Sequence, residues 1–276
     1  LLTAFVLYES RSPIAMMPMR IFANRSRAGS YVIMPILGAA LFGMFYYLTF
    51  FIQGVMGFSS LKSGLAYLPF SGIIIVGSGI VGQVLPRTGP KVLLTAGSAF
   101  MAAGMFWYAQ VDAGTRYASG ILPAMIVTAT GVALVFVTLT VVAVTKVTDT
   151  DTGLASALLN VGQQIGGSIG LAVLATAFTS ATKTEGTSQV AKLTGASRQH
   201  LAELIGSTQS GKPASPAAYT DHPALQAFHA VQAHGSSQSF LVAGILGIVA
   251  VIAALMLIKV KKSDVPQASE LAFAAA

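Results

Sequence analysis

Long stretches without a charged residue dominate the pattern of hydrophobic and polar positions along this chain. They occupy residues 28–61, 63–86, 92–111, 117–145 and 152–182, and a further apolar run covers residues 240–258. Each is near or above the roughly 20 residues that a helix needs to cross the ~30 Å hydrocarbon core of a bilayer. The runs are longer than membrane-spanning strands and do not alternate polar with apolar residues. The pattern therefore predicts an all-α membrane protein with six membrane-spanning helices.

The composition agrees with lipid as the solvent of these runs. Hydrophobic residues make up 54% of the chain and charged residues 9%, and the mean hydropathy is +0.73. Soluble proteins carry about 25% charged residues, so a soluble domain of this composition would expose large apolar patches. The chain has no cysteine, which excludes disulfides and thiolate metal sites.

Basic residues fall unequally on the two sides of such a bundle. If six helices alternate in direction, the short loops of one side hold only Lys62 and Arg116, whereas ten basic residues lie on the other side. Those ten are Arg11, Arg20, Arg25, Arg27, Arg87, Lys91, Lys146, Lys259, Lys261 and Lys262. The positive-inside rule makes the richer side cytoplasmic. We therefore interpret the net charge of +7 as a topology signal of a multi-pass protein in the cell (plasma) membrane, not as a nucleic-acid-binding patch.

The start of the chain is interpreted as the continuation of an earlier segment. Its apolar opening shows neither the basic start nor the cleavage site of a signal peptide. We expect residues 1–8 to end a preceding transmembrane helix, residues 9–27 to form a cytoplasmic linker and residues 28–182 to hold five transmembrane helices. The sequence therefore predicts the C-terminal part of a longer protein.

A long polar connection precedes the last apolar run. Residues 183–238 are expected to form an external loop, 239–258 the last transmembrane helix and 259–276 a cytoplasmic tail. All four histidines lie in or near this loop, and they are His200, His222, His229 and His234. Their spacing matches no tight set of metal ligands, so a solvated loop is favoured over a metal site. Pro223 suits the first turn of a helix that leads into the last span.

The fifth run carries a stripe of polar residues. Ser156, Asn160, Gln164 and Ser168 recur every four residues, so they wind slowly around one side of a helix, with Gln163 beside them. Amide groups exposed to lipid would lack hydrogen-bond partners. Two interpretations fit this stripe: its amides line a substrate pathway, or they bond to neighbouring helices.

The same run carries glycines on a different face. Gly162, Gly166 and Gly170 show the small-x-x-x-small spacing that lets another helix pack closely. We therefore expect this face to be a helix-packing surface.

Aromatic residues crowd the outer part of the first run. They are Phe42, Phe45, Tyr46, Tyr47, Phe50 and Phe51, and Gln53 follows them. Phe45, Tyr46 and Gln53 are candidate substrate-pathway residues, because aromatic rings stack on planar or cationic drugs. An aromatic belt at the membrane interface explains many of these positions equally well. Trp107 and Tyr108, near the end of the third run, are expected to belong to such a belt.

A short basic connection, GQVLPRTGPKVLL (residues 82–94), joins the second and third runs. Gly82 and Gly89 permit close approach and a positive-φ turn, and prolines 86 and 90 are expected to stop the helices. A tight cytoplasmic turn with anchoring charges, Arg87 and Lys91, explains most of this pattern.

The connection also resembles the G-x-x-x-D-R-x-G-R-K signature of the major facilitator superfamily. Gly82, Arg87, Gly89 and Lys91 match in place, whereas prolines stand where the family has its Asp and often an Arg. Three further stretches resemble the fourteen-helix drug/proton antiporter branch. They are PMRIFANR at 18–25, GFSSLKSGLAYLP at 57–69 and GLASALLNVGQQIGGSIGLAVLAT at 153–176.

This resemblance implies the six-helix C-terminal half of a transporter, built as two inverted three-helix repeats. It implies proton-coupled export of hydrophobic or amphipathic drugs by alternating access, with a small-molecule substrate, a lipid bilayer around the helices, no cofactor and no enzymatic activity. Arg87 and Lys91 would then bias the conformational state rather than bind substrate.

No Asp, Glu, Lys, Arg or His lies inside any of the six runs. Since proton relays need such groups, a titrating carboxylate would have to come from the N-terminal half. A non-transporting scaffold or sensor is the alternative function. A membrane enzyme is the least favoured, because the chain has neither HExxH nor a phosphate-binding GxxxxGK[ST] loop.

Overall fold

The computed structural model describes residues 19–145, 147, 149–210 and 213–259 of the chain. The expected end of a preceding helix at residues 1–8, Lys146 and nearly all of the expected tail lie outside these described residues. Within them all regular structure is helical, as expected for an all-α protein. The helices are η1 (Met19–Phe22), α2 (Arg25–Gly54), α3 (Ser60–Ala66), α4 (Leu68–Thr88), α5 (Pro90–Tyr108), η2 (Tyr117–Ile121), α6 (Leu122–Val144), α7 (Asp149–Lys192), α8 (Gly195–Ser210), α9 (Pro216–Thr220) and α10 (His222–Leu257).

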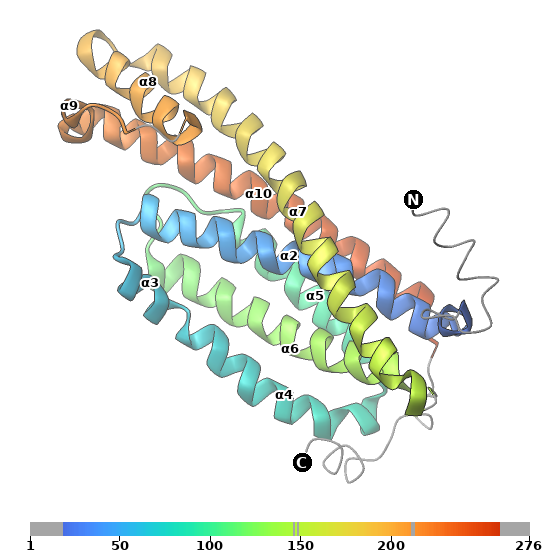
Figure 1. The fold of residues 1–276 in the computed structure, drawn as a ribbon. Coiled ribbons are helices and arrows are strands. Elements are labelled where there is room, and N and C mark those ends of the chain that lie inside the picture. The colour runs from blue at the N-terminus through green and yellow to red at the C-terminus, as the bar shows by residue number, and fades with distance from the viewer. Residues whose placement is uncertain (1–18, 146, 148, 211–212, 260–276) are drawn as a thin grey trace.

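The long helices α2, α4, α5, α6, α7 and α10 form one bundle (Figure 1). In the described part of the chain, five helical segments are long and apolar enough to cross a membrane: α2, α3 with α4, η2 with α6, α7 and α10. The expected third span forms α5, which has 19 residues and is not among those five. Lys91 in its first turn and its many small or polar residues reduce its hydrophobicity. It nevertheless packs between α6 and α10 inside the bundle.

Helix pairing in the bundle has the symmetry of two inverted three-helix repeats. The first repeat is α2, α4 and α5, and the second is α6, α7 and α10. The contact between α2 and α7 corresponds to the contact between α6 and α4. The contact between α5 and α6 corresponds to the contact between α10 and α2, and α5 also packs against α10. Exchanging the corresponding helices of the two repeats maps the first four contacts onto one another in pairs and the α5–α10 contact onto itself, as expected for a facilitator half. The α7–α10 contact departs from this symmetry, because it is far more extensive than its counterpart between α4 and α5.

The turn between α4 and α5 depends on Gly89. This residue has φ +85°, a left-handed value that favours glycine, and Pro90 then opens α5. The expectation that Pro86 stops the preceding helix is wrong, because α4 continues through Pro86 to Thr88. Gly82 lies within α4 and has open space where a Cβ would be, so it mediates no close approach.

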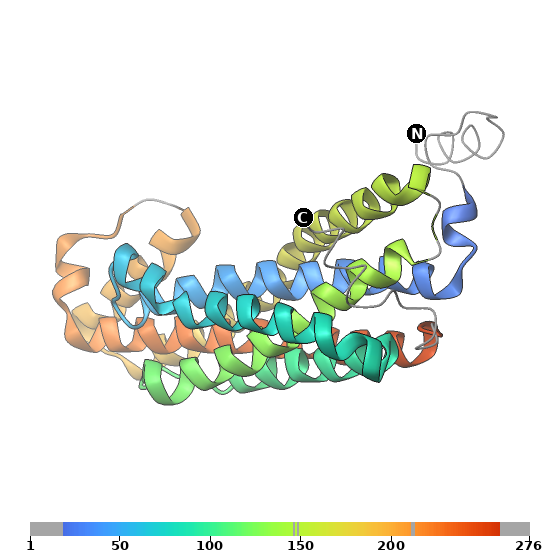
Figure 2. The ribbon, with the colours of Figure 1, turned by 90° about the horizontal axis from the view of Figure 1, so that it is seen from below.

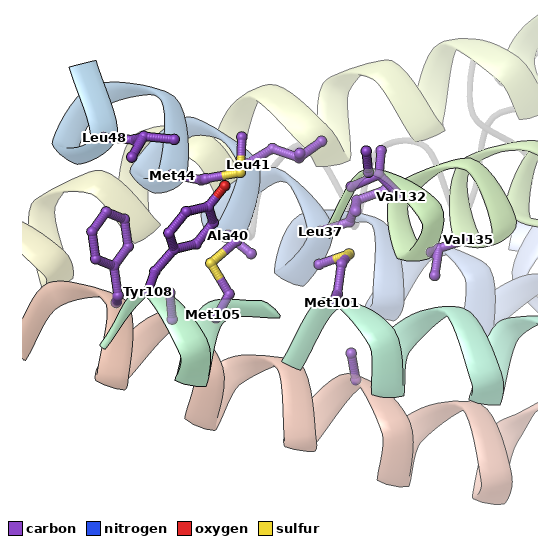
Figure 3. Close-up of a cluster of buried hydrophobic side chains, with 14 of the residues drawn as sticks. Leu37, Ala40, Leu41, Met44, Leu48, Met101, Met105, Tyr108, Val132 and Val135 are labelled. Atoms are coloured by element: carbon purple, nitrogen blue, oxygen red, sulfur yellow. The ribbon is translucent and has the colours of Figure 1, made fainter. Parts of the chain in front are cut away.

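The core lies between α2, α5 and α6 (Figure 3). Leu37, Met44 and Leu48 of α2 face Met101, Met105 and Tyr108 of α5, with Val132 and Val135 of α6 beside them. Tyr108 is fully buried, and its ring centroid lies 5.1 Å from that of Phe240 in α10. The expectation that Tyr108 joins an interfacial belt is therefore wrong. Neighbouring residues of a helix point about 100° apart, so Trp107 is exposed while Tyr108 faces the core.

Residues 183–238, named here the hairpin, are mostly helical rather than an irregular loop. α7 continues to Lys192, α8 and α9 follow, and α10 begins at His222. Asp221 caps α10 by accepting a hydrogen bond from the Ala224 N–H, with Pro223 in the first turn as expected. Figures 1 and 2 show α8 and α9 at the end of the bundle where α3 lies.

A small apolar cluster holds the hairpin together. It comprises Leu201, Leu204, Ala218, Ala224 and Ala227, from α8, α9 and α10. The polar composition of the segment indicates solvation of its outer faces. It does not prevent helices, since a narrow apolar stripe is enough to pack them together.

Candidate functional site

An aromatic pocket of about 830 Å³ lies along the second half of α2. Its lining residues are Phe42, Phe45, Tyr46, Thr49, Phe50, Gln53 and Gly54 of α2 and Leu171 of α7. They share one side of α2 because they recur at spacings of three and four residues. The structure thus brings together the three α2 residues that the sequence singled out as pathway candidates: Phe45, Tyr46 and Gln53.

Ring contacts hold the wall of this pocket in place. The ring centroid of Phe45 lies 5.4 Å from that of Tyr67 and 5.2 Å from that of Phe70. The hydroxyl groups of Thr49 and Tyr67 are 2.8 Å apart, which fixes the neighbouring turn of α2. Phe45 and Tyr46 remain 40% and 55% exposed. The wall therefore presents positioned ring faces to the pocket.

The lining of the pocket contains no charged side chain. Its polar groups are the Thr49 and Tyr46 hydroxyls and the Gln53 amide. Aromatic faces with few hydrogen-bonding groups are typical of sites for apolar or amphipathic small molecules.

The polar stripe of α7 lies on the outside of the described bundle. Asn160, Gln164 and Ser168 are exposed, and Ser156 and Gln163 are partly exposed. Asn160 donates a hydrogen bond from Nδ2 to the Ser156 carbonyl oxygen at 3.3 Å, within its own helix. Among the described residues, no side-chain hydrogen bond joins Asn160, Gln163 or Gln164 to another helix. The geometry of the described chain therefore offers no interhelical bond for these amides.

The glycine face of α7 packs against α2. Gly166 contacts the backbone of Pro35 and Gly170 contacts Ala39, each so closely that a Cβ would overlap the neighbouring helix. Gly162 lies beside the Pro35 ring, where a Cβ would be at an ordinary 3.5 Å. The glycine side of α7 therefore packs against α2, and the polar stripe lies on a different side of α7.

The stripe and the pocket lie at different levels of one surface, not in one pocket. α2 and α7 run parallel, with Pro35 beside Gly166 and Tyr47 beside Phe178. The stripe is therefore near the first half of α2, and the pocket is near the second half. Phe42, whose ring lies over Gly167, stands between them.

The charges of the candidate conformational motif point away from the bundle. Arg87 and Lys91 are exposed on either side of the buried Gly89. Among the residues that the structure describes, neither side chain has a hydrogen-bond or ion-pair partner. The turn thus presents two exposed cations at the end of the bundle where α2 begins.

Hydrogen bonds at the same end of the bundle were not predicted from the sequence. Arg25 donates a hydrogen bond to the Met256 carbonyl oxygen at 3.0 Å, and the Lys259 N–H donates one to Ser26 Oγ at 2.8 Å. Arg27 donates one to the Thr145 carbonyl oxygen at 3.1 Å. The first turn of α2 therefore holds the ends of α10 and α6. No local pattern announces such contacts, since the partners are distant in sequence.

The chain matches the family model described as Major Facilitator Superfamily over residues 9–171. It is 34% identical over 185 residues to the puromycin resistance protein pur8 of Streptomyces alboniger, and the aligned region covers 66% of this chain and 37% of that relative. It is 32% identical over 185 residues to the cephamycin export protein CmcT of Amycolatopsis lactamdurans, covering 66% and 38%. It is 32% identical over 170 residues to the tetracenomycin C resistance and export protein of Streptomyces glaucescens, covering 62% and 31%.

The chain thus spans about a third of the length of the curated relatives it matches. The family match begins before α2 and extends into α7, so it covers most of the bundle and none of the hairpin. It includes the turn around Gly89 and both sides of the α2–α7 contact. Paired inverted repeats, the resistance and export relatives and a match over more than half of the sequence agree, and the chain belongs to the Major Facilitator Superfamily.

Proposed function

We propose that this chain forms the C-terminal half of a secondary active transporter that exports hydrophobic or amphipathic small molecules by alternating access. The observation that carries this proposal is the aromatic pocket along α2, which opens on the same outer surface as the amides of α7. The resistance and export functions named for the relatives support the same direction and class of cargo.

The proposed cargo follows from the chemistry of the pocket. Phe45 and Tyr46 offer ring faces for stacking, and Gln53 offers one amide for a hydrogen bond. Without a charged lining residue, the pocket favours molecules whose bulk is apolar and whose polar groups are few. Asn160, Gln163, Gln164 and Ser156 continue this pathway toward the other end of the bundle.

Proton coupling is part of the proposal, with the titrating carboxylate on the N-terminal half. The apolar runs of this chain contain no Asp, Glu, His, Lys or Arg, and a proton relay needs such a group. Arg87 and Lys91 are placed on the cytoplasmic side, where they contact the other half in one conformational state. An acidic partner there would favour that state by direct charge pairing.

The remaining apolar surface is proposed to face lipid in the cell membrane. Ile75 in α4 and Met256 in α10 are 74% and 62% exposed, although both are large and apolar. The end of the bundle with more Lys and Arg residues is assigned to the cytoplasm by the positive-inside rule. The hairpin, at the opposite end, then lies outside the cell.

A transport measurement tests this function and separates it from a scaffold or an enzyme. Inverted vesicles carrying the intact protein are expected to accumulate a fluorescent amphipathic dye when a proton gradient is imposed, and an uncoupler should stop uptake. Phe45→Ala is expected to lower uptake about three- to tenfold, in line with the loss of one aromatic contact. Uptake that neither the uncoupler nor Phe45→Ala reduces would contradict the proposal.

A further inference from the structure

A second pocket, of about 500 Å³, lies where the hairpin meets the bundle. Four helices contribute to it: Tyr46, Tyr47 and Phe50 from α2, Ala175, Phe178, Thr179 and Thr182 from α7, Ile205 and Thr208 from α8, and Phe228, Val231 and Gln232 from α10. Its volume is within the range of small-molecule sites. The family match ends at residue 171, before most of these residues.

The floor of the second pocket is a fixed aromatic cluster. The ring of Phe178 stacks on Tyr47 at a centroid distance of 5.2 Å and meets the edge of Phe50 at 5.3 Å. Gly235 of α10 lies against Phe178 and Thr182, and a Cβ there would overlap the ring. The cluster is therefore held from both α2 and α10, and its shape is set before a ligand arrives.

Gln232 lines this pocket and carries an acceptor that no described residue uses. Its side chain is 5% exposed, and its Oε1 atom has no hydrogen-bond donor among the described residues. A buried carbonyl oxygen without a donor is unfavourable, and most such groups in proteins are paired. A donor from a bound molecule would satisfy it. No charged residue lines the pocket, so a neutral donor fits better than an ion.

We propose that this second pocket is a separate subsite for a neutral aromatic molecule that stacks on the Tyr47–Phe178 cluster and donates an N–H or O–H hydrogen bond to Gln232. The site itself stands on its own geometry, and its place on an export path rests on the proposed transport function. Tyr46 and Phe50 line both pockets, so the two are adjacent and share a wall. α8 covers the second pocket through Ile205, which packs against Gly186 of α7. A cargo molecule leaving the first pocket therefore meets the subsite before it passes the hairpin.

The subsite is tested by equilibrium binding to the intact protein in lipid nanodiscs, with empty nanodiscs as the blank. The probe is N-phenyl-1-naphthylamine, which is aromatic, neutral and has one N–H. In a Phe45→Ala background, which weakens binding in the first pocket, saturable binding to the second pocket is expected to persist. Ile205→Trp fills the subsite and should abolish that binding, whereas Gln199→Trp, at an exposed position of the same helix, should preserve it. Equal binding by both tryptophan variants would overturn the proposal.

A milder variant keeps the test decisive if Ile205→Trp does not fold. Gln232→Met preserves the length of the side chain and removes the acceptor. It should weaken N-phenyl-1-naphthylamine binding about three- to tenfold, the loss of one hydrogen bond, and leave 1-phenylnaphthalene, which has no N–H, unaffected. An equal loss for both probes would show a structural role only and reject the assignment. Dye export does not enter these readouts, so binding without export would contradict the transport function and leave the subsite standing.

Discussion

Arg27, in the first turn of α2, donates a hydrogen bond to the carbonyl oxygen of Thr145, the residue that ends α6. The distance is 3.1 Å, and the arginine is only 7% exposed. The contact joins the first helix of one inverted repeat to the first helix of the other. With the bonds that Arg25 and Ser26 make to the end of α10, it holds both repeats together at the basic end of the bundle.

Arg27→Gln is expected to destabilise the bundle by about 1.5–3 kcal/mol, because it removes a buried hydrogen bond from a charged donor. The measurement is the thermal unfolding of the detergent-solubilised protein. Arg87→Gln is the matched control, since it removes a charge from the same end of the bundle, where the side chain is exposed and has no hydrogen-bond or ion-pair partner among the described residues. Equal unfolding temperatures for the two variants would show that the Arg27 contact contributes nothing.

Gly166→Ala is expected to cost about 1–3 kcal/mol, the usual penalty of overpacking. A Cβ at this position overlaps the backbone of Pro35, so α7 has to move away from α2. Gly153→Ala in the same helix is the control, because nothing lies within 4 Å of the added methyl group. That change should stabilise α7 by about 0.5–1 kcal/mol through helix propensity. Unfolding curves of both variants that shift in the same direction would contradict this packing.

Gln164→Ala is expected to lower dye transport about three- to tenfold while the yield of folded protein stays unchanged. Its side chain is exposed and bonds to no neighbouring helix in the described chain, so a loss of transport would report on cargo. Gln189→Ala serves as the control, because Gln189 lies in the hairpin part of α7 and bonds to Glu185. A fall in folded yield with Gln164→Ala would favour a structural role for the stripe.

The hairpin is expected to loosen in acid through Asp221. The pKa of this carboxyl is lowered chiefly by its 2.7 Å hydrogen bond with His200, and the Ala224 N–H and Ser197 hydroxyl add to the effect against desolvation. A lowered folded-state pKa means that the stabilisation is complete above the ordinary value of about 3.9 and is lost as pH falls through the folded value. Amide hydrogen exchange of α8, corrected for intrinsic rates, should therefore accelerate only in that acidic range.

Asp221→Asn should leave α8 less protected at neutral pH and reduce the acid transition to the part contributed by Glu203, whose pKa is lowered chiefly by its hydrogen bonds with Ser215. Asp112→Asn is its control, because Asp112 bonds to Gly114 and Thr115 in the turn before η2 and not to the hairpin. If α8 of the Asp221→Asn protein showed the wild-type acid transition, another group would be responsible.

Local physical chemistry explains the parts of the fold that were predictable. Hydrophobicity accumulates along a run, so the apolar stretches predicted the long helices, and Pro223 predicted the first turn of α10. The α4–α5 turn was predictable at Gly89, since only glycine adopts its backbone readily, but not at Pro86, which the last turn of α4 accommodates.

The candidate site was predictable as a set of residues and not as an arrangement. The sequence named Phe45, Tyr46 and Gln53 as pathway candidates from their chemistry, and the structure places all three in the lining of one pocket. Spacing within each helix could not show that the polar stripe of α7 lies beside the first half of α2 rather than beside the pocket, because that position depends on how α2 and α7 align. The subsite around Gln232 gave no signal, since its walls come from four helices that are far apart in the sequence.

The sequence by itself determined that lipid surrounds the apolar runs, that the protein is all-α and that one end of the bundle is rich in Lys and Arg. Hydrophobicity and charge are properties of each segment alone, so they can be read without the fold. Tertiary structure decided which face of each helix is covered. Tyr108 is buried and Trp107 exposed because α10 packs on one side of α5 only. The described residues between 183 and 238 are mostly helical and share an apolar cluster, because neighbouring segments supply the surface on which Leu201 and Leu204 are buried. Such choices depend on contacts between distant segments, and these exist only once the chain has folded.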